Sequence, residues 1–525
     1  MIQKHLAAVL SAAAVLGACS ASVAEPAADK AVLPANQLNS HWYADAEKVL
    51  QQAEQRQVNH KRGAAKNIIL FLGDGMGIST VTAGRIFAGQ QQGKSGEENL
   101  LSFERLPYSG LIKTYNTNQQ VPDSAGTMSA IMTGVKTRAG VLSVDQNVLR
   151  GDCAGSRGHE LNSALKLAAL DGKGTGVITT ARVTHATPGA TYANVAERDW
   201  EYAAPKGCVD IAAQFVAFQP GNGLDLLMGG GRRNFLPENF TDKEGAHGKR
   251  MDGRNLVDEW KKRYAGGPLR AHYIADEKGF DKLDSAHTDK LLALFDPSHM
   301  HYEADRKNDK AGEPSLSQMT AKGIDLLQKH KDGYFLVIEG GRIDHANHAG
   351  NAYNALNETA EFARAVQVAM DKTDPRDTLI VVTADHSHSL TMSGYATRGN
   401  PILGLVVGND AHGQPQEKPE LAEDGKPYTT IHYANGKGYA DLGDETDADA
   451  RYDMPTRAGR IEHADVDTTA PGYHQEVLVP RDGETHSGED VGIWARGPSA
   501  DLLTGTHEQN LIFHVMVHAG GLLPE

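Results

Sequence analysis

Short apolar runs bounded by glycine and aspartate are the feature that most constrains the fold of this chain. They cover residues 67–72, 174–180, 333–338 and 377–383, and they are built mainly from aliphatic and β-branched residues. Runs of this length and composition are typical of strands that are buried on both faces of a parallel sheet. Because helical patterns lie between them, the sequence predicts an α/β fold with a mostly parallel central sheet flanked by helices.

The rest of the chain divides around this predicted core. Residues 38–396 carry most of the core pattern, and residues 475–525 return to it. The stretch between them, 397–474, is rich in Gly, Asp and Pro and lacks long apolar runs, so we predict an inserted small surface domain there. Residues 25–37 are rich in Ala and Pro and are predicted to be a tether.

Residues 1–24 have the pattern of an export signal. The apolar run 6–16 is much shorter than the roughly 20 residues that a spanning helix needs. Residues 16–19 resemble a bacterial lipobox, which would place a lipid on Cys19, whereas cleavage after Ala24 would give a soluble product. Of the three cysteines, lipidation of Cys19 would leave Cys153 and Cys208 as a pair, and loss of Cys19 with the leader would leave the same pair. We expect a lipid-anchored protein on the periplasmic side or outer membrane, with a soluble periplasmic or secreted protein as the alternative.

The net charge limits the partners of the protein. The chain carries 52 Lys and Arg against 67 Asp and Glu, a formal net charge of −15. Non-specific nucleic-acid binding depends on neutralising phosphates with basic residues, so we do not expect it as the main role. An anionic substrate would also be repelled unless bound cations reverse the local charge.

Carboxylates and imidazoles follow three of the predicted strands. Sites in open α/β sheets form outside the carboxyl ends of strands, so these side chains should meet at one edge. Asp344 and His348 are four residues apart, which places them on one face of a helix. Each motif alone is more often a turn or a surface pair, but their coincidence predicts a metal site, and zinc suits such oxygen and nitrogen ligands. The residues concerned are Asp74, Glu339, Asp344, His348, Asp385 and His386.

Ser124 begins a run of small residues that favours a closely packed helix. Its hydroxyl would then lie at a helix N-terminus, where amide N–H groups and the helix dipole favour an anion. The alternative is that Ser124 only caps the helix. Since the chain has no Gly-x-Ser-x-Gly motif, we expect a neighbouring metal rather than a hydrolase triad to activate this serine.

Taken together, these segments resemble the alkaline phosphatase family, and their amino-acid sequences are more similar to those of its animal-type branch. The similarity extends from about residue 37 to residue 519. The resemblance implies hydrolysis of phosphate monoesters through a covalent phosphoserine, with release of inorganic phosphate. The motifs that carry it are residues 66–82, 121–127, 182–188, 339–348, 383–388 and 484–492.

The resemblance also implies roles for individual residues. Ser124 would be the nucleophile and Arg198 would bind phosphate, although Arg198 without the resemblance would be taken for a surface charge. His185 and His345 fall at positions that surround the metal ligands in the family and would tune them. Asp344, His348 and His486 would bind one zinc, Asp385 and His386 a second zinc, and Asp74 would be shared with a magnesium site completed by Thr187 and Glu339.

Further family features are implied in less detail. Cys153 and Cys208 match a family disulfide, with two free thiols as the alternative, and the family relationship implies a homodimer. The inserted region 397–474 occupies the position of the family's crown domain but has little sequence similarity to it. A calcium site is left open, because Phe295, Asp296 and Glu313 lie near the corresponding stretch without a complete ligand set.

Two alternative functions remain at this stage. One is a phosphodiesterase or sulfatase of the same superfamily, although sulfatases need Pro and Arg at fixed spacing after the modified residue, which the sequence after Ser124 lacks. The other is a non-catalytic zinc-binding surface lipoprotein, which would have no use for a nucleophile. The charge balance favours a phosphatase, because two Zn²⁺ and one Mg²⁺ would outweigh the four nearby carboxylates and attract a phosphate dianion.

Overall fold

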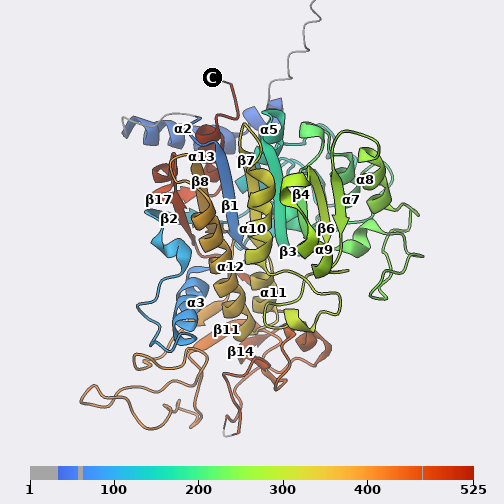
Figure 1. Ribbon diagram of the computed structural model, residues 1–525. Helices are drawn as coiled ribbons and strands as arrows, with labels where there is room; N and C mark the ends of the chain where they lie inside the picture. The colour runs from blue at the N-terminus through green and yellow to red at the C-terminus, as the bar shows by residue number, and fades with distance from the viewer. Residues whose placement is uncertain (1–32, 57–62, 464, 525) are drawn as a thin grey trace, which may run out of the picture.

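The computed structural model describes residues 33–56, 63–463 and 465–524, and it confirms the predicted α/β fold (Figure 1). A central ten-stranded sheet has the order β17-β2-β16-β8-β1-β7-β3-β4-β6-β5. The predicted apolar runs are its central strands: β1 (Asn67–Gly73), β3 (Gly174–Arg182), β7 (Tyr334–Gly340) and β8 (Thr378–Ala384).

The central part of the sheet is parallel, and one strand near its edge runs the other way. β1 pairs in parallel with both β7 and β8, so that Leu70 lies opposite Val337 on one side and Val381 on the other. β16 lies antiparallel between β8 and β2. The remaining strands of the sheet are β2 (Tyr108–Lys113), β4 (Leu226–Gly230), β5 (Ala271–Ile274), β6 (Lys290–Leu294), β16 (Val491–Arg496) and β17 (Gly505–Glu508).

Helices cover both faces of the sheet (Figure 1). On one face α10 (Leu316–Leu327) and α12 (Ala352–Lys372) pack on the central strands, and α3 (Ile78–Gln90) packs on α12. On the other face lie α4 (Ser124–Thr133), α5 (Ala164–Leu170) and α13 (Leu511–Gly520). The other helices are α1 (Ala35–Leu38), α2 (His41–Arg56), α6 (Ala186–Gly189), α7 (Ile211–Ala217), α8 (Leu256–Tyr264), α9 (Glu277–Lys282), α11 (Arg342–His348) and short 3-10 turns η1 (Ser102–Arg105), η2 (Pro220–Asn222), η3 (Arg232–Phe235), η4 (Ser285–His287), η5 (Arg306–Asn308), η6 (Ala448–Asp453) and η7 (Ala500–Leu503).

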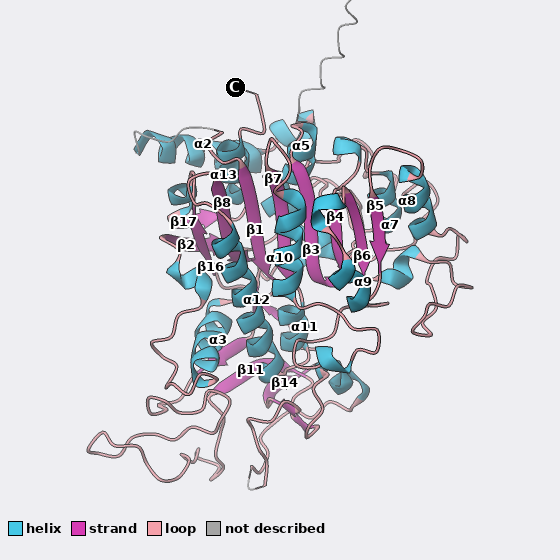
Figure 2. Ribbon diagram, viewed as in Figure 1, coloured by secondary structure: helices cyan, strands magenta, loops and turns pink. Residues whose placement is uncertain are grey.

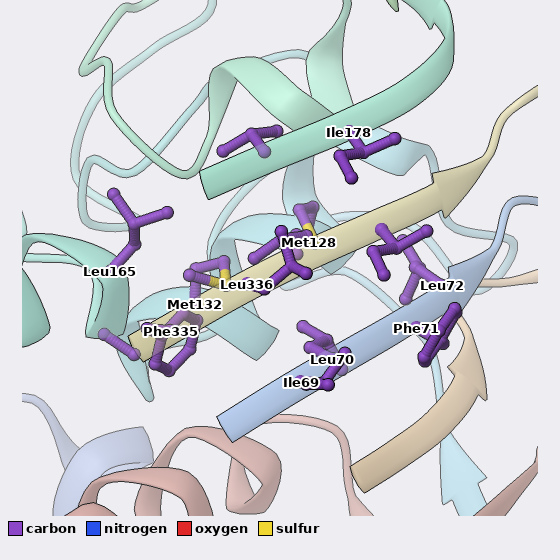
Figure 3. Packing of buried hydrophobic residues seen from close by; sticks show 14 of the residues in the cluster. Ile69, Leu70, Phe71, Leu72, Met128, Met132, Leu165, Ile178, Phe335 and Leu336 are labelled. Atoms are coloured by element: carbon purple, nitrogen blue, oxygen red, sulfur yellow. The ribbon is translucent and has the colours of Figure 1, made fainter. Parts of the chain in front are cut away.

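The main core joins the sheet to helix α4. Met128 and Met132 of α4 belong to the same buried cluster as Phe335 and Leu336 of β7 (Figure 3). The helix can lie this deep because its first turn is made of small residues. A side chain at Gly126 would place its Cβ 2.6 Å from Oδ1 of Asn116 and 3.0 Å from the Arg138 carbonyl oxygen, so any larger residue would force its neighbours to shift.

The carboxyl ends of the central strands point toward the end of the molecule at which β11 (Ile431–Gly436) and β14 (Val477–Pro480) lie (Figure 2). β11 pairs with β10 (Leu390–Met392), which precedes the predicted insertion, and with β14, which follows it. Two small pairs complete this region: β12 (Ala440–Asp441) with β13 (Tyr473–His474), and β9 (Ser387–His388) with β15 (His486–Ser487). The division of the chain at residues 397 and 474 stays a prediction.

The described residues contain one disulfide. Cys153 and Cys208 are joined, with their Cα atoms 5.8 Å apart, which confirms the predicted pair. The export signal, Cys19 and most of the predicted tether fall within residues 1–32, outside the described residues. Within the described ranges, no helix combines the length and the apolar character that crossing a membrane requires.

Candidate active site

The carboxyl ends of three adjacent strands bring buried carboxylates together. Asp74 follows β1, Asp385 follows β8, and Glu339 lies near the end of β7, opposite Leu72 of β1. Each of the three side chains is at most 1% exposed. The predicted convergence of acidic residues at one edge of the sheet is therefore present.

The first cluster combines one carboxylate with three imidazoles. Helix α11 begins directly after β7 and carries Asp344 and His348, whose Oδ1 and Nε2 atoms lie 3.3 Å apart. His486 of β15 approaches from the C-terminal part of the chain, with its Nε2 3.1 Å from Nε2 of His348 and 3.4 Å from Oδ1 of Asp344. His388 of β9 completes the group, and the ligand atoms of these four residues could hold one metal ion.

The second cluster lies beside Ser124. Nε2 of His386 is 3.3 Å from carboxylate oxygens of both Asp74 and Asp385. The hydroxyl oxygen of Ser124 lies 2.9 Å from the same Nε2 atom. His386, Asp74 and Asp344 form a group that could hold a second metal ion.

The third cluster lies on the other side of Asp74. Ligand atoms of Asp74, Glu339 and His185 converge, and the Thr187 hydroxyl donates to Asp74 Oδ2 at 3.5 Å. The hydroxyl of Thr179 donates to Glu339 Oε2. His185, which the sequence placed outside the ligand set, thus lies close enough to Asp74 and Glu339 to be a ligand.

The unpartnered oxygens of these clusters fit divalent cations. Asp74 Oδ1 and Glu339 Oε1 are buried and have no hydrogen-bond partner among the described residues. Burial, followed by the neighbouring carboxylates Asp385, Asp344 and Glu339, raises the pKa of Asp74 well above its usual range. Burial also raises the pKa of Glu339 to about 7. Buried, mutually repelling carboxylates of this kind are stabilised by metal ions, which supply the missing positive charge.

The protonation states of His386 and Asp344 also suit the binding of divalent cations. Burial and the neighbouring ring of His486 lower the pKa of His386 well below its usual value, so its ring is neutral and able to bind a metal. Burial opposes ionisation of Asp344, but its contacts with His348, His388 and His486 hold its pKa well below the usual range. Asp344 therefore remains a carboxylate at neutral pH.

Ser124 is the first residue of α4, and Asp123 caps the helix. The Asp123 carboxylate accepts a hydrogen bond from the Gly126 amide at 3.0 Å. The alternative that Ser124 serves only as the cap is therefore wrong. With that task taken by its neighbour, the Ser124 hydroxyl lies at the positive end of the helix dipole and faces His386.

Arg198 lies in the same region and is held by three contacts. Its Nη1 is 3.4 Å from Oδ2 of Asp123, and its Nη2 donates to Nε2 of His185 at 3.3 Å. Its backbone N–H donates to the Gly140 carbonyl at 2.8 Å. Asp123 thus links the guanidinium to the helix that begins with Ser124, and Arg198 is not the free surface charge that its local sequence would indicate.

Comparison with known proteins decides the family. A family model described as alkaline phosphatase matches residues 65–522. The chain belongs to the alkaline phosphatase family. Its activity is alkaline phosphatase activity, EC 3.1.3.1, which the sequence resemblance implied.

The relatives agree with the resemblance to the animal-type branch. The chain is 44% identical over 496 residues to the tissue-nonspecific alkaline phosphatase of Gallus gallus, covering 92% of this chain and 90% of the relative. It is 42% identical over 493 residues to the human tissue-nonspecific isozyme, covering 91% and 88%. The alkaline phosphatase of Thermus thermophilus has a similar fold, with a TM-score of 0.62 and 23% identity over 90% of this chain and 94% of that one.

Sequence reasoning missed two residues of this alkaline phosphatase site, His388 and Glu484. His388 lies between two carboxylates, with Nε2 2.7 Å from Asp344 Oδ1 and Nδ1 2.5 Å from Glu484 Oε2. Although burial disfavours the charged ring, Glu484 and Asp344 raise its pKa to about 10. The run Asp-His-Ser-His at 385–388 was the available signal, because residues two apart in an extended segment point to the same side, and His386 and His388 are two apart.

A separate cluster lies where the sequence left a calcium site open. His301 Nδ1 is 3.6 Å from Asp296 Oδ2 and 3.5 Å from Glu313 Oε1. Glu313, with Asp296, raises the pKa of His301 to about 9, against the effect of burial. Glu313 Oε2 is buried without a hydrogen-bond partner among the described residues, and the ligand atoms of Asp296, His301 and Glu313 lie close enough to hold one metal ion, so the calcium site stays open.

Proposed function

We propose that the chain hydrolyses phosphate monoesters through a phosphoserine formed on Ser124. The observation that carries the proposal is the 2.9 Å approach of the Ser124 hydroxyl to Nε2 of His386, at a helix N-terminus and beside the buried cluster of carboxylates. A metal store would need the carboxylates and imidazoles but no serine in this position. The geometry therefore supports catalysis over the non-catalytic alternative.

We further propose two zinc ions and one magnesium ion as cofactors. Asp344, His348 and His486 would hold one zinc, with His388 beside them. Asp385 and His386 would hold the other, and Asp74 would be shared between this zinc and a magnesium ion held with Thr187 and Glu339. When bound, such cations favour ionised oxygen nucleophiles and offset the charge of phosphoryl groups. Metal analysis of the purified protein should find zinc and magnesium in a ratio of two to one.

The chain's own residues supply positioning and charge. The Ser124 oxygen attacks phosphorus and loses its proton to solvent. The bond between phosphorus and the ester oxygen breaks, and that oxygen takes a proton from solvent and leaves as the alcohol. Water then attacks the same phosphorus, which breaks the bond to Ser124 and releases inorganic phosphate. Arg198 has a planar fork of donors that suits two non-transferred oxygens of a phosphate monoester dianion.

Trapping the intermediate tests this proposal. The enzyme is incubated with labelled inorganic phosphate, quenched at low pH and digested, and the labelled peptide is sequenced. We expect the label on Ser124. Label on another residue, or a Ser124→Ala protein that still becomes labelled, would contradict the assignment.

We also propose that the protein is exported, anchored by a lipid on Cys19 and homodimeric. The support is the sequence of residues 1–24, the pairing of the other two cysteines and the family relationship. Intact-mass measurement on the membrane fraction should show a lipidated N-terminus at Cys19. A soluble product that begins at Glu25 would contradict the anchor, and light scattering would test the dimer.

A further inference from the structure

The predicted insertion reaches back to the helix that carries two metal-ligand candidates. Helix α11 begins at Arg342 and carries Asp344 and His348. The 3-10 turn η6, from the predicted insertion, packs against α11. The insertion therefore contacts the helix that carries Asp344 and His348.

Three side chains form a closed set of contacts at this junction. Arg342 Nη2 donates to Asp449 Oδ2 at 2.9 Å, and the Tyr302 hydroxyl donates to Asp449 Oδ1 at 2.7 Å. The guanidinium carbon of Arg342 lies 3.7 Å from the centre of the Tyr302 ring. Asp449 therefore fixes both the direction of the Arg342 guanidinium and the ring on which it stacks.

The other end of the guanidinium contacts His345. Nη1 of Arg342 lies 3.0 Å from Nδ1 of His345. Arginine has only donors, so Nδ1 must accept, and the neutral ring carries its proton on Nε2. The His345 ring lies 5.6 Å, between centroids, from the ring of His185, which belongs to the third cluster.

We propose that Asp449 is a positioning residue of the active site, which acts through Arg342 to fix the tautomer and orientation of His345 and the start of helix α11. The insertion thereby contributes to phosphate hydrolysis without contacting the substrate. Outer hydrogen-bond partners of this kind set the orientation and basicity of the groups that bind metal ions.

The segment that presents Asp449 is itself held firmly. The buried guanidinium of Arg451 donates to the carbonyls of Gly438 and Lys437 at 3.1 and 2.6 Å. The Lys437 ammonium donates to the carbonyl of Tyr452 at 2.8 Å. These contacts fix the backbone on the far side of η6, so Asp449 is presented to Arg342 in one position.

The Asp449 contact is better suited to orientation than to stability. The Asp449 side chain is 40% exposed, whereas that of Arg342 is 5% exposed. In Asp449→Asn the amide oxygen can still accept a hydrogen bond from the buried Arg342 guanidinium, so this cation keeps a partner when the carboxylate charge is removed. Loss of this carboxylate should therefore change the geometry around His345 more than it changes the stability of the fold.

The test compares two variants of the same turn. Asp449→Asn keeps the shape of the side chain and removes its charge, and Asp453→Asn makes the same charge change at an exposed position of η6. We expect Asp449→Asn to lower kcat for p-nitrophenyl phosphate about tenfold with KM unchanged, because the residue acts through the groups around the metal ions. We expect Asp453→Asn to keep the kcat of the parent and both variants to keep its thermal midpoint.

A double-mutant cycle separates positioning from a general structural effect. If Asp449 acts through His345, then Asp449→Asn should lower kcat no further in a protein that already carries His345→Gln. Additive losses in the double variant would overturn the proposal. Equal kcat values for Asp449→Asn and Asp453→Asn would also overturn it. Should Asp449→Asn fold poorly, Tyr302→Phe removes the other contact of Asp449 and takes its place in the same cycle.

Discussion

Asp123 caps the helix that begins with Ser124, and this leaves the Ser124 hydroxyl free to lie 2.9 Å from Nε2 of His386. The two neighbours therefore have different tasks. Asp123 satisfies the Gly126 amide and contacts Arg198, whereas Ser124 faces the buried carboxylates. One turn of helix thus positions both the proposed nucleophile and the guanidinium that we propose binds phosphate.

The Ser124→Ala variant should lose turnover while it keeps its metal ions. The proposed metal ligands are carboxylates, imidazoles and the Thr187 hydroxyl, so the substitution removes the attacking oxygen and leaves these ligands in place. Hydrolysis of p-nitrophenyl phosphate and metal content by mass spectrometry would be measured together. Ser129→Ala, which removes another buried hydroxyl of α4, is the control. It should keep turnover and lose about 1 to 3 kcal/mol of stability, because the Ser129 hydroxyl donates to the Ala125 carbonyl and accepts from the buried Ser143 amide, which would lose its partner.

Arg198→Ala should weaken inhibition by inorganic phosphate. A charge-assisted, two-pronged contact contributes about 1.5 to 3 kcal/mol, so the inhibition constant should rise at least tenfold. Arg150→Ala is the matched control, because Arg150 pairs with the neighbouring residues Glu197 and Asp199 on the exposed side. An inhibition constant that is the same in both variants would mean that Arg198 does not contact phosphate.

The stability of the metal-free protein should fall as the pH rises. The folded-state pKa of Glu339 is raised to about 7 from an ordinary value of 4.5, so the protonated side chain stabilises the fold below about pH 4.5. That contribution is lost as the pH rises through 7, and it amounts to about 3 kcal/mol. Urea unfolding of chelator-treated protein at several pH values would measure it.

Two comparisons make this pH dependence specific. Glu339→Gln should flatten the loss of unfolding free energy between about pH 5 and pH 8, because the amide does not titrate. Restoring zinc and magnesium to the parent protein should also reduce the loss of unfolding free energy with pH, because bound cations take the place of the proton on Glu339. An unchanged slope in Glu339→Gln would exclude Glu339 as its origin.

His388→Gln should weaken zinc binding at the first cluster. The His388 ring contacts Asp344 and is held by Glu484, so its loss leaves that ligand carboxylate without its closest partner. Loss of such a partner typically costs about 10- to 100-fold in metal affinity. Competition with a coloured chelator would give the affinity, with His412→Gln, on an exposed loop, as the control. Equal affinities in the two variants would exclude the role of His388.

Replacing Cys153 and Cys208 together by serine should lower the free energy of unfolding. The bridge spans a sequence separation of 55, for which the chain-entropy model gives about 4 kcal/mol. Denaturant unfolding of the variant and of the parent would measure the difference. A reducing agent should destabilise the parent and leave the variant unaffected. An effect of the same size on both proteins would mean that the disulfide is not the origin of the lost stability.

The sequence was sufficient for the central strands because each is a short run of mainly aliphatic and β-branched residues. Asn67–Gly73 and Thr378–Ala384 needed no information from distant residues to be recognised. The antiparallel placement of β16 could not be predicted in this way. β16 pairs with β8 on one side and β2 on the other, and these strands come from distant parts of the chain, so its direction is a property of the whole fold.

The site shows the same division between local and non-local information. Asp344 and His348 could be paired from their spacing on one helix. His388 and Glu484 are 96 residues apart, and only the pairing of β9 with β15 brings them into contact. The N-cap role of Asp123 and the link from Asp449 to Arg342 depend on side-chain geometry that no spacing rule expresses.

The antiparallel strand β16 and His486 both come from the last tenth of the chain. β16 occupies the gap between β8 and β2, and His486 completes the first cluster, so neither the sheet nor that cluster can close earlier. A ribosome must therefore translate almost the whole message before this phosphatase can act. Any product of interrupted translation that ends before residue 486 lacks both His486 and strand β16.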